Sequence, residues 1–409
     1  MQRRRGGIIF AIIFLDLLGF GIIMPQLGIY ARHYEASGLV QGLLVGSYSA
    51  MQFVFAPLLG RWSDRVGRRP VLLVSLFTSF CAHLLFGVSR SLALLFVSRV
   101  VDGLGGANIA TAQAYLSDVT PAERRARAMA MIGMAFGLGF VLGPAVGAVV
   151  GHWGTSHLGA HGGNLAIGLV AAACSLGTMV LTVRWLPESL PPDKRRRAEG
   201  PLRLIDTESL RRALALPVLP RLLLVALIST GGFAVLHAIL TYFVVDVSGL
   251  RLTDAAGMAR AQAATGKVFA WIGCLSILAQ GSVHAGARRV GEAVLLRAGL
   301  ALMVLALVSL PLVHSSGAML VLMTPLAIGN ALCSATIPAL LTLHSPPDQR
   351  GEILGVNTSL GSIGRIGGPL SGGFLYDLGR AVPFAVGAVL CAVALYFALR
   401  LPRHAPGSE

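Results

Sequence analysis

The sequence predicts an all-α integral membrane protein with twelve transmembrane helices in two pseudo-symmetric six-helix bundles. Three observations predict this fold: the composition, the succession of apolar stretches, and an internal repeat. Of the 409 residues, 55% are hydrophobic and 12% are charged, whereas soluble globular proteins carry about 25% charged residues. A spanning helix needs about 20 apolar residues, so the chain accommodates about twelve spans. This composition excludes an ordinary soluble enzyme, a disordered chain and a disulfide scaffold.

The apolar stretches follow one another as six, a polar gap, and six. They lie at 7–30, 40–60, 70–88, 92–115, 127–151 and 164–187, and then at 219–246, 257–282, 293–313, 317–342, 351–376 and 381–401. Each has the length that a membrane-spanning helix requires. We therefore expect one bundle in each half of the chain, with short loops between successive helices.

The polar gap from Glu188 to Pro220 contains several prolines and the basic run Lys194, Arg195, Arg196 and Arg197. It predicts a hydrophilic linker, in which the stretch 206–216 permits an amphipathic helix. The expected domains are an N-terminal six-helix bundle over 1–187, a cytoplasmic basic linker over 188–218 and a C-terminal six-helix bundle over 219–409.

The distribution of basic residues predicts the orientation in the membrane. If the N-terminus is cytoplasmic, twenty-five of the 33 Lys and Arg residues fall on the cytoplasmic side, five on the opposite side and three within spans. Basic residues are retained on the cytoplasmic side of a membrane. We therefore expect a multi-pass protein of the cell inner (plasma) membrane with both termini cytoplasmic. The net charge of +15 is then a topology signal, and no nucleic-acid partner is expected.

An internal repeat relates the two halves at a separation of 225 residues. Pro121, Arg125, Gly139, Gly143, Pro144 and Gly147 recur as Pro346, Arg350, Gly364, Gly368, Pro369 and Gly372. Near the same separation, Arg65-Val66-Gly67 recurs as Arg289-Val290-Gly291. Duplicated six-helix units in parallel orientation are typical of transporters in which two bundles rock about a central site.

The loop between spans 2 and 3 is very short and dense in charge. Glycine at position 60 is expected to permit close helix approach, glycine at 67 a tight turn, and Asp64 can pair with an arginine or with a helix N-terminus. The pattern resembles the signature loop of the major facilitator superfamily, G-x-x-x-D-R-x-G-R-R. This resemblance implies a gating role for Gly60, Asp64, Arg65, Gly67, Arg68 and Arg69. The alternative, a positive-inside loop without further role, explains the arginines but not Asp64 or the glycine spacing.

Asp16 lies ten residues into the first span, where an acid is costly unless it is paired, hydrated or protonated. It is therefore a candidate proton-binding group. The segment from Leu15 to Pro25 resembles the first helix of the drug:proton antiporter family with twelve spans, particularly its tetracycline-type exporters. The alternative is a structural role, in which Asp16 caps or braces an inner gate.

Span 4 carries Arg99 and Asp102, which are three residues apart and can meet on one helical face. Such a pair offsets the desolvation cost of both charges. The segment resembles the fourth-helix motif of the family, whose arginine is associated with proton coupling. The resemblance makes Asp16, Arg99 and Asp102 the proton-coupling candidates. A purely structural ion pair remains the alternative.

Glycines spaced by four residues line one face of span 5, which permits a neighbouring backbone to pack closely. The stretch resembles the G-x-x-x-G-P-x-x-G motif of the antiporter branch, which is associated with export. The resemblance assigns this motif to Gly139, Gly143, Pro144 and Gly147. Among the other polar residues within spans, those nearest the middle are weak substrate-binding candidates, namely Asn108, Gln113, His237 and Asn330.

These observations together predict a secondary active transporter that exports small amphipathic or hydrophobic compounds by proton antiport. The expected partners are a small-molecule substrate, protons and the lipid bilayer, and the protein is expected to be a monomer without cofactor, metal or enzymatic activity. No Walker loop for ATP binding is present in the sequence. Tetracycline exporters are expected to hold an acid in the ninth span, but 293–313 contains none.

Two alternatives remain open. A metabolite or sugar carrier of the same superfamily, acting as a uniporter or symporter, fits the small number of acids within the spans. A receptor or scaffold that transports nothing is a hypothesis of a different class. Proton-dependent movement of a compound separates these possibilities.

Overall fold

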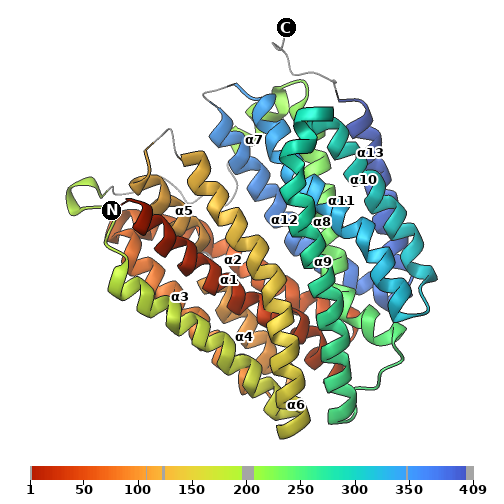
Figure 1. Cartoon of the computed structure of the whole chain (residues 1–409). Coiled ribbons are helices and arrows are strands. Elements are labelled where there is room, and N and C mark those ends of the chain that lie inside the picture. Colours follow the sequence, from red (N-terminus) through yellow and green to blue (C-terminus); the bar gives the residue numbers. More distant parts are fainter. Residues whose placement is uncertain (1, 107, 122–124, 196–206, 347–348, 402–409) are drawn as a thin grey trace. The chain divides into compact units, whose positions relative to one another are not determined.

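The computed structural model describes residues 2–106, 108–121, 125–195, 207–346 and 349–401. All regular secondary structure in these ranges is helical (Figure 1). The second part of the basic run, Arg196 and Arg197, lies outside the described residues.

The helices follow the predicted order of spans. In the first half they are α1 Gln2–His33, α2 Gly38–Val66, α3 Arg68–Gly87, α4 Leu92–Gly105, α5 Asn108–Val119 and α6 Arg125–Trp185. In the second half they are α7 Thr207–Ala215, α8 Leu219–Val247, α9 Ala255–Val290, α10 Glu292–Ser309, α11 Ser316–Leu343, α12 Arg350–Leu378 and α13 Val382–Leu399, and the short 3₁₀ turns are η2 Pro192–Lys194 and η3 Leu310–Leu312.

Ten helices in the described ranges are long and apolar enough to cross a membrane. One of them, Gly137–Trp185, has 49 residues and would extend over about 70 Å, more than twice the hydrocarbon thickness of about 30 Å. Gly159 interrupts this helix with φ 75° and ψ −179°, so α6 provides two passes. The remaining pass is α12, whose glycines, serines and Arg365 lower its mean hydropathy. The twelve-helix fold is thereby confirmed.

Two predicted details have a clear outcome. The amphipathic helix permitted at 206–216 is present as α7, where Arg212 pairs with Glu208 at 3.1 Å and with Glu352 of α12 at 3.5 Å. The span predicted over 92–115 corresponds to Leu92–Val119, which is one of the ten candidate spans and includes α4 and α5. Within this span Gly105 packs closely on α3, since an added Cβ there would lie 2.6 Å from the Ser75 carbonyl oxygen.

The described chain forms two compact units. Unit 1 comprises Met1–Ala36, Ser47–Leu204 and Leu250–Ala270, and unit 2 comprises Ser37–Gly46, Ile205–Gly249 and Trp271–Glu409. Helices α2 and α9 therefore contribute to both units. The boundaries at 187 and 219, which follow the internal repeat, stay a prediction.

Polar contacts at the helix ends explain why α2 and α9 are shared. In unit 2, the Asp377 carboxylate near the end of α12 accepts hydrogen bonds from the backbone N–H of Gly38 (2.6 Å) and Leu39 (2.8 Å). It satisfies two N–H groups that the first turn of α2 leaves without partners. In unit 1, Gln262 of α9 donates to the Tyr30 hydroxyl of α1 at 3.4 Å.

Glycine contacts show that the internal repeat is also a repeat of packing. In unit 1 an added Cβ at Gly143 of α6 would lie 2.6 Å from Cα of Gly21 in α1. In unit 2 an added Cβ at Gly368 of α12 would lie 2.7 Å from the carbonyl oxygen of Gly231 in α8. Both helix pairs, α1 with α6 and α8 with α12, are therefore in backbone contact at equivalent positions of the repeat.

Candidate functional site

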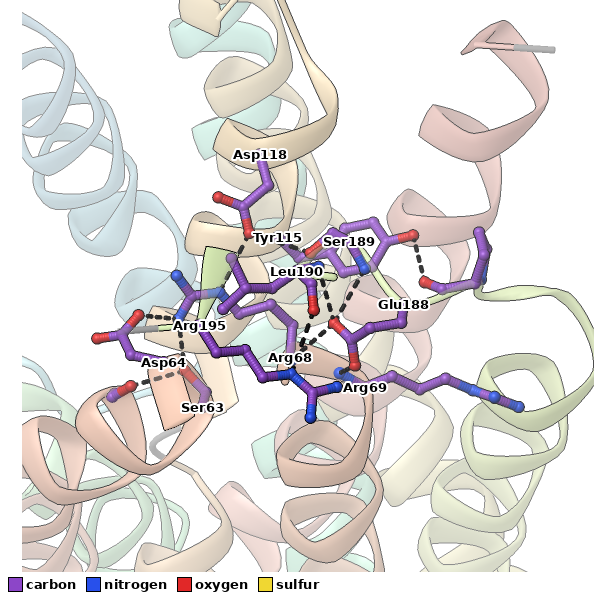
Figure 2. Close-up of polar contacts among 12 residues, drawn as sticks. Ser63, Asp64, Arg68, Arg69, Tyr115, Asp118, Glu188, Ser189, Leu190 and Arg195 are labelled. Atoms are coloured by element: carbon purple, nitrogen blue, oxygen red, sulfur yellow. Dashed lines mark hydrogen bonds and ion pairs between the residues drawn. The ribbon is translucent and has the colours of Figure 1, made fainter. Parts of the chain in front are cut away.

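A network of charges surrounds Arg68, the first residue of α3 (Figure 2). Its guanidinium pairs with Asp64 of α2 at 2.6 Å and with Asp118 of α5 at 3.2 Å. It also donates to the Ser63 hydroxyl at 2.6 Å. Arg68 is 9% exposed, and a largely buried guanidinium with two acids and a hydroxyl is well compensated. Arg68 therefore joins the ends of three helices.

Glu188, directly after α6, binds the same loop from the other side. Its carboxylate accepts hydrogen bonds from the backbone N–H groups of Arg68 (2.8 Å) and Arg69 (3.1 Å). It also accepts from the N–H groups of Ser189 at 2.9 Å and Leu190 at 3.0 Å. Because an acid near a helix N-terminus interacts favourably with the helix dipole, Glu188 fixes the start of the linker to the start of α3 (Figure 2).

The predicted local features of the gating loop have different outcomes. Gly67 has φ 110° and forms the tight turn that was predicted. Asp64 pairs with Arg68, and an arginine is one of the two kinds of partner that were predicted for it. The predicted close approach at Gly60 is wrong, because an added Cβ there would meet nothing within 4 Å; instead, its carbonyl accepts a hydrogen bond from the Ser63 hydroxyl.

The two remaining arginines of the motif lie in the same segment. Arg65 belongs to the last turn of α2. Arg69 donates to the Val183 carbonyl in α6 at 2.6 Å, so it adds a second connection between α3 and the end of α6. The gating role of the motif stays a prediction.

Replacement of Glu188 by alanine is expected to lower the free energy of unfolding by about 1.5–3 kcal/mol, because a charged acceptor of backbone N–H groups is lost. Thermal unfolding of purified protein in detergent measures this effect. Glu208→Ala is the matched control, since Glu208 is 67% exposed at its side chain and pairs with Arg212 on the surface of α7. Such surface pairs contribute about 0–1 kcal/mol. Equal losses in the two variants would contradict an anchoring role for Glu188.

Asp16 of α1 and Asn108 of α5 form one unit of the intramembrane site. The Asn108 amide donates to the Asp16 carboxylate at 2.8 Å. Asn108 is 5% exposed, whereas Asp16 is half-buried. The structure thus places a weak substrate candidate directly on a proton-coupling candidate.

Arg99 and Asp102 meet on one face of α4, as their spacing predicts, with 3.1 Å between guanidinium and carboxylate. The pair is fully enclosed, with Arg99 0% and Asp102 3% exposed. His83 of α3 lies 3.8 Å from the second oxygen of Asp102, and its Nδ1 is 3.0 Å from the Ser175 hydroxyl of α6. Asp16 and Asp102 also interact electrostatically, so the three proton-coupling candidates belong to one region of unit 1.

The predicted antiporter motif lies where α6 contacts α1. Added Cβ atoms at Gly139 and Gly143 would lie 2.8 Å from the Leu17 Cβ and 2.6 Å from the Gly21 Cα respectively, and one at Gly147 would overlap the Ile22 carbonyl. The predicted close packing of this face is confirmed. Pro144 lies between these contacts within α6. The association of the motif with export stays a prediction.

The weak substrate candidates do not form one group. Asn108 and Gln113 lie in α5 of unit 1, whereas His237 and Asn330 lie in α8 and α11 of unit 2. Gln113 is exposed, and His237 and Asn330 are half-buried. The His237 ring lies 5.9 Å from the Phe233 ring. Substrate binding by any of the four stays a prediction.

Sequence reasoning did not single out Glu188, Asp118 or His83 as functional residues. The signal for the two acids was available, since each stands at the end of a span on the side that carries most basic residues. The contacts of His83 come from three helices and have no local sequence signal. In the described ranges, no group of three or more His, Cys, Asp or Glu side chains is arranged for a metal ion.

Two repeated six-helix halves, a charged loop that joins helix ends and ionisable groups within the spans define a membrane transport protein. A family model described as Major Facilitator Superfamily matches residues 9–369 and 257–409. The chain belongs to the major facilitator superfamily. Its resemblance to that family, first seen in the loop between spans 2 and 3, is thus confirmed.

Similar proteins include resistance proteins of bacteria. The chain is 31% identical to the class C tetracycline resistance protein of Escherichia coli over 95% of this chain and 94% of that protein. It is 27% identical to multidrug resistance protein 1 of Bacillus subtilis over 97% and 96%. A class E tetracycline resistance protein of Escherichia coli is 43% identical over 34% of this chain and 35% of that protein.

Solved structures agree with this assignment. The human organic anion transporter MFSD10 is 26% identical, with a TM-score of 0.69 over 97% of this chain and 99% of that chain. The nucleoside transporter NupG, at 13% identity, has a TM-score of 0.75 over 96% and 98%, which shows the shared fold.

Proposed function

We propose that this transporter exports small amphipathic or hydrophobic compounds in exchange for protons. The observation that carries the proposal is Asp16, an acid within α1 that is half-buried and bonded to Asn108 at 2.8 Å. Acids within membrane spans are typical of proton pathways. A group that binds a coupled proton must exchange it with water, so we propose that the Asp16 carboxyl group becomes hydrated in one of the two states of the transporter.

Binding or release of a proton at Asp16 changes the charge beside the enclosed Arg99–Asp102 pair. Ligands and protons shift a conformational equilibrium only if they bind the two states with different affinity. Asp16 lies in α1, and the backbones of α1 and α6 are in direct contact. A change of charge at Asp16 therefore acts on a closely packed helix pair. We propose that alternating access is driven through this pair.

The similarity to tetracycline and multidrug resistance proteins supports an apolar or amphipathic cargo. Lys267 in α9 and Arg365 in α12 are exposed although each lies within a predicted span. A charge that faces lipid costs about 2.5–3.5 kcal/mol. We therefore propose that each of these two side chains contacts water. From the distribution of basic residues we also propose that the protein works in the inner membrane with both termini cytoplasmic.

Uptake into inverted vesicles, which corresponds to export from the cell, tests the proposal with ethidium as a lipophilic cation and tetracycline as a second compound. Each is measured with an imposed proton gradient, without a gradient, and with a protonophore. Gradient-dependent movement that the protonophore abolishes is expected. Movement that ignores the gradient would contradict antiport and favour a uniporter, and movement of neither compound would favour a carrier for a metabolite or sugar.

A further inference from the structure

His83 is a buried titratable group that the proposed mechanism does not use. It lies in α3 and is 1% exposed. Its Nε2 is 3.8 Å from Oδ1 of Asp102, while the other oxygen of Asp102 accepts from Arg99 at 3.1 Å. Within the described part of the chain, the Nε2 atom of His83 and one terminal nitrogen of Arg99 have no hydrogen-bond partner. Buried polar atoms normally have a partner, so this cluster has unused hydrogen-bonding capacity.

The surroundings of the imidazole indicate which nitrogen carries its proton. Nδ1 lies 3.0 Å from the Ser175 hydroxyl, and the ring also interacts with the Ala171 backbone. A proton on Nε2 would be drawn into a hydrogen bond with the adjacent carboxylate, which the distance of 3.8 Å does not show. The geometry therefore fits a neutral ring that is protonated on Nδ1, with the lone pair of Nε2 facing Asp102.

The charged groups around His83 come from every helix that packs on it. Helix α4 contributes Arg99 and Asp102. Helix α1 passes so close that an added Cβ at Gly19 would lie 3.0 Å from Cε1 of His83, and Asp16 is one turn away on the same helix. Helix α6 contributes the Ser175 hydroxyl beside the thiol of Cys174, which interacts with Asp16. In α5, Asp118 is held at the loop by Arg68.

These groups carry one negative charge more than positive charges when the imidazole is neutral. Asp16 and Asp102 each contribute a negative charge, and Arg99 contributes the single positive charge. An uncompensated charge in a buried site is costly. One proton restores neutrality, whether it binds Asp16 or His83.

We propose that His83 is a second proton-binding group of this transporter and shares one exchangeable proton with Asp16. This inference rests on the proposed proton antiport and deepens it. The proton comes from water and binds the lone pair of Nε2, which makes this atom a donor to Oδ1 of Asp102. On release, the N–H bond breaks, the electron pair stays on nitrogen and the proton returns to water. Asp102 is thereby bound to Arg99 alone in one state and to both cations in the other.

The test compares wild type, His83→Asn and Ser175→Ala. Asparagine places an amide near Ser175 but cannot carry the proton, whereas Ser175→Ala removes the hydroxyl and keeps the imidazole. Gradient-driven uptake of ethidium and tetracycline into proteoliposomes is measured from about pH 5 to pH 8, the range in which histidine titrates. Coupled groups change one another's titration by about one pH unit or more. The pH of half-maximal rate is therefore expected to move by about one unit in His83→Asn and by less in Ser175→Ala, which keeps the imidazole and removes only the partner of its Nδ1.

Proton uptake by the purified proteins after an acid pulse is the second measurement, because it needs no transported compound. The midpoint of uptake is expected to move by about one unit in His83→Asn and by less in Ser175→Ala. An unchanged midpoint in this variant overturns the inference, and so does an equal shift in Ser175→Ala, since both variants alter the packing of α3 on α6. Absence of gradient-driven transport in wild type would overturn the proposed antiport instead, and the uptake experiment would still decide on His83.

Discussion

Asp16→Asn is expected to reduce gradient-driven efflux to the level of vesicles without the protein, while the protein remains inserted and folded. Asparagine has nearly the same shape as aspartate and can still bond to Asn108, whose amide lies 2.8 Å from the carboxylate. The asparagine amide cannot bind or release a proton between about pH 5 and pH 8. The loss therefore reports the proton-binding role of Asp16 and not its volume.

The measurement is efflux of ethidium and tetracycline with an imposed proton gradient, together with thermal unfolding in detergent. Asp16→Glu is the matched control, because it retains a carboxyl group in α1 and is expected to keep part of the proton-driven flux. Unchanged proton-coupled flux in Asp16→Asn would remove Asp16 from the mechanism. Unchanged flux with a lower unfolding temperature would instead identify a bracing role for this side chain.

Gly143→Ala is expected to have the largest effect on stability. An added Cβ would lie 2.6 Å from Cα of Gly21 and 2.9 Å from the backbone nitrogen of Ile22 in α1. These are backbone atoms, so relief requires the two helices to separate. Overpacking of this kind costs about 1–3 kcal/mol and occasionally more.

Gly137→Ala in the same helix is the matched control, since an added Cβ there meets nothing within 4 Å. Alanine is a better helix former than glycine by about 1 kcal/mol, so this variant is expected to be as stable as wild type or more stable. The repeat offers a second pair in α12, where Gly368→Ala is expected to destabilise and its neighbour Gly367→Ala is not. Thermal unfolding of the four purified variants measures the differences, and equal stability of Gly143→Ala and Gly137→Ala would disprove the close contact.

The arrangement of the loop between α2 and α3 could be predicted only in part. The turn at Gly67 follows from local backbone requirements, and the pairing of Asp64 with Arg68 is also local, because this short turn places the end of α2 beside the start of α3. The role of Glu188 could not be derived, because it depends on where α6 ends relative to α3. The error at Gly60 has the same origin: glycine permits a close approach but does not require that another helix approaches.

The contacts among the ionisable and polar groups within the spans could likewise be predicted only in part. Arg99 and Asp102 are three residues apart, so a single helix brings them together. Asp16 and Asn108 are 92 residues apart, and His83 and Ser175 also come from different helices. Such contacts depend on helix rotation and packing, which no short motif encodes.

Twelve membrane spans, a repeat of the two halves and the resemblance to the superfamily could all be predicted from the amino-acid sequence. These predictions are possible because the hydrocarbon core of the membrane requires each span to have a certain length and an apolar character. Regularly spaced glycines in addition indicate where helices pack closely. Three features are apparent only in the folded structure: α2 and α9 contribute to both compact units, Glu188 binds the start of α3, and His83 lies beside Asp102. These contacts join residues that are distant in the chain, and their partners are selected by side-chain packing and by the satisfaction of buried polar groups.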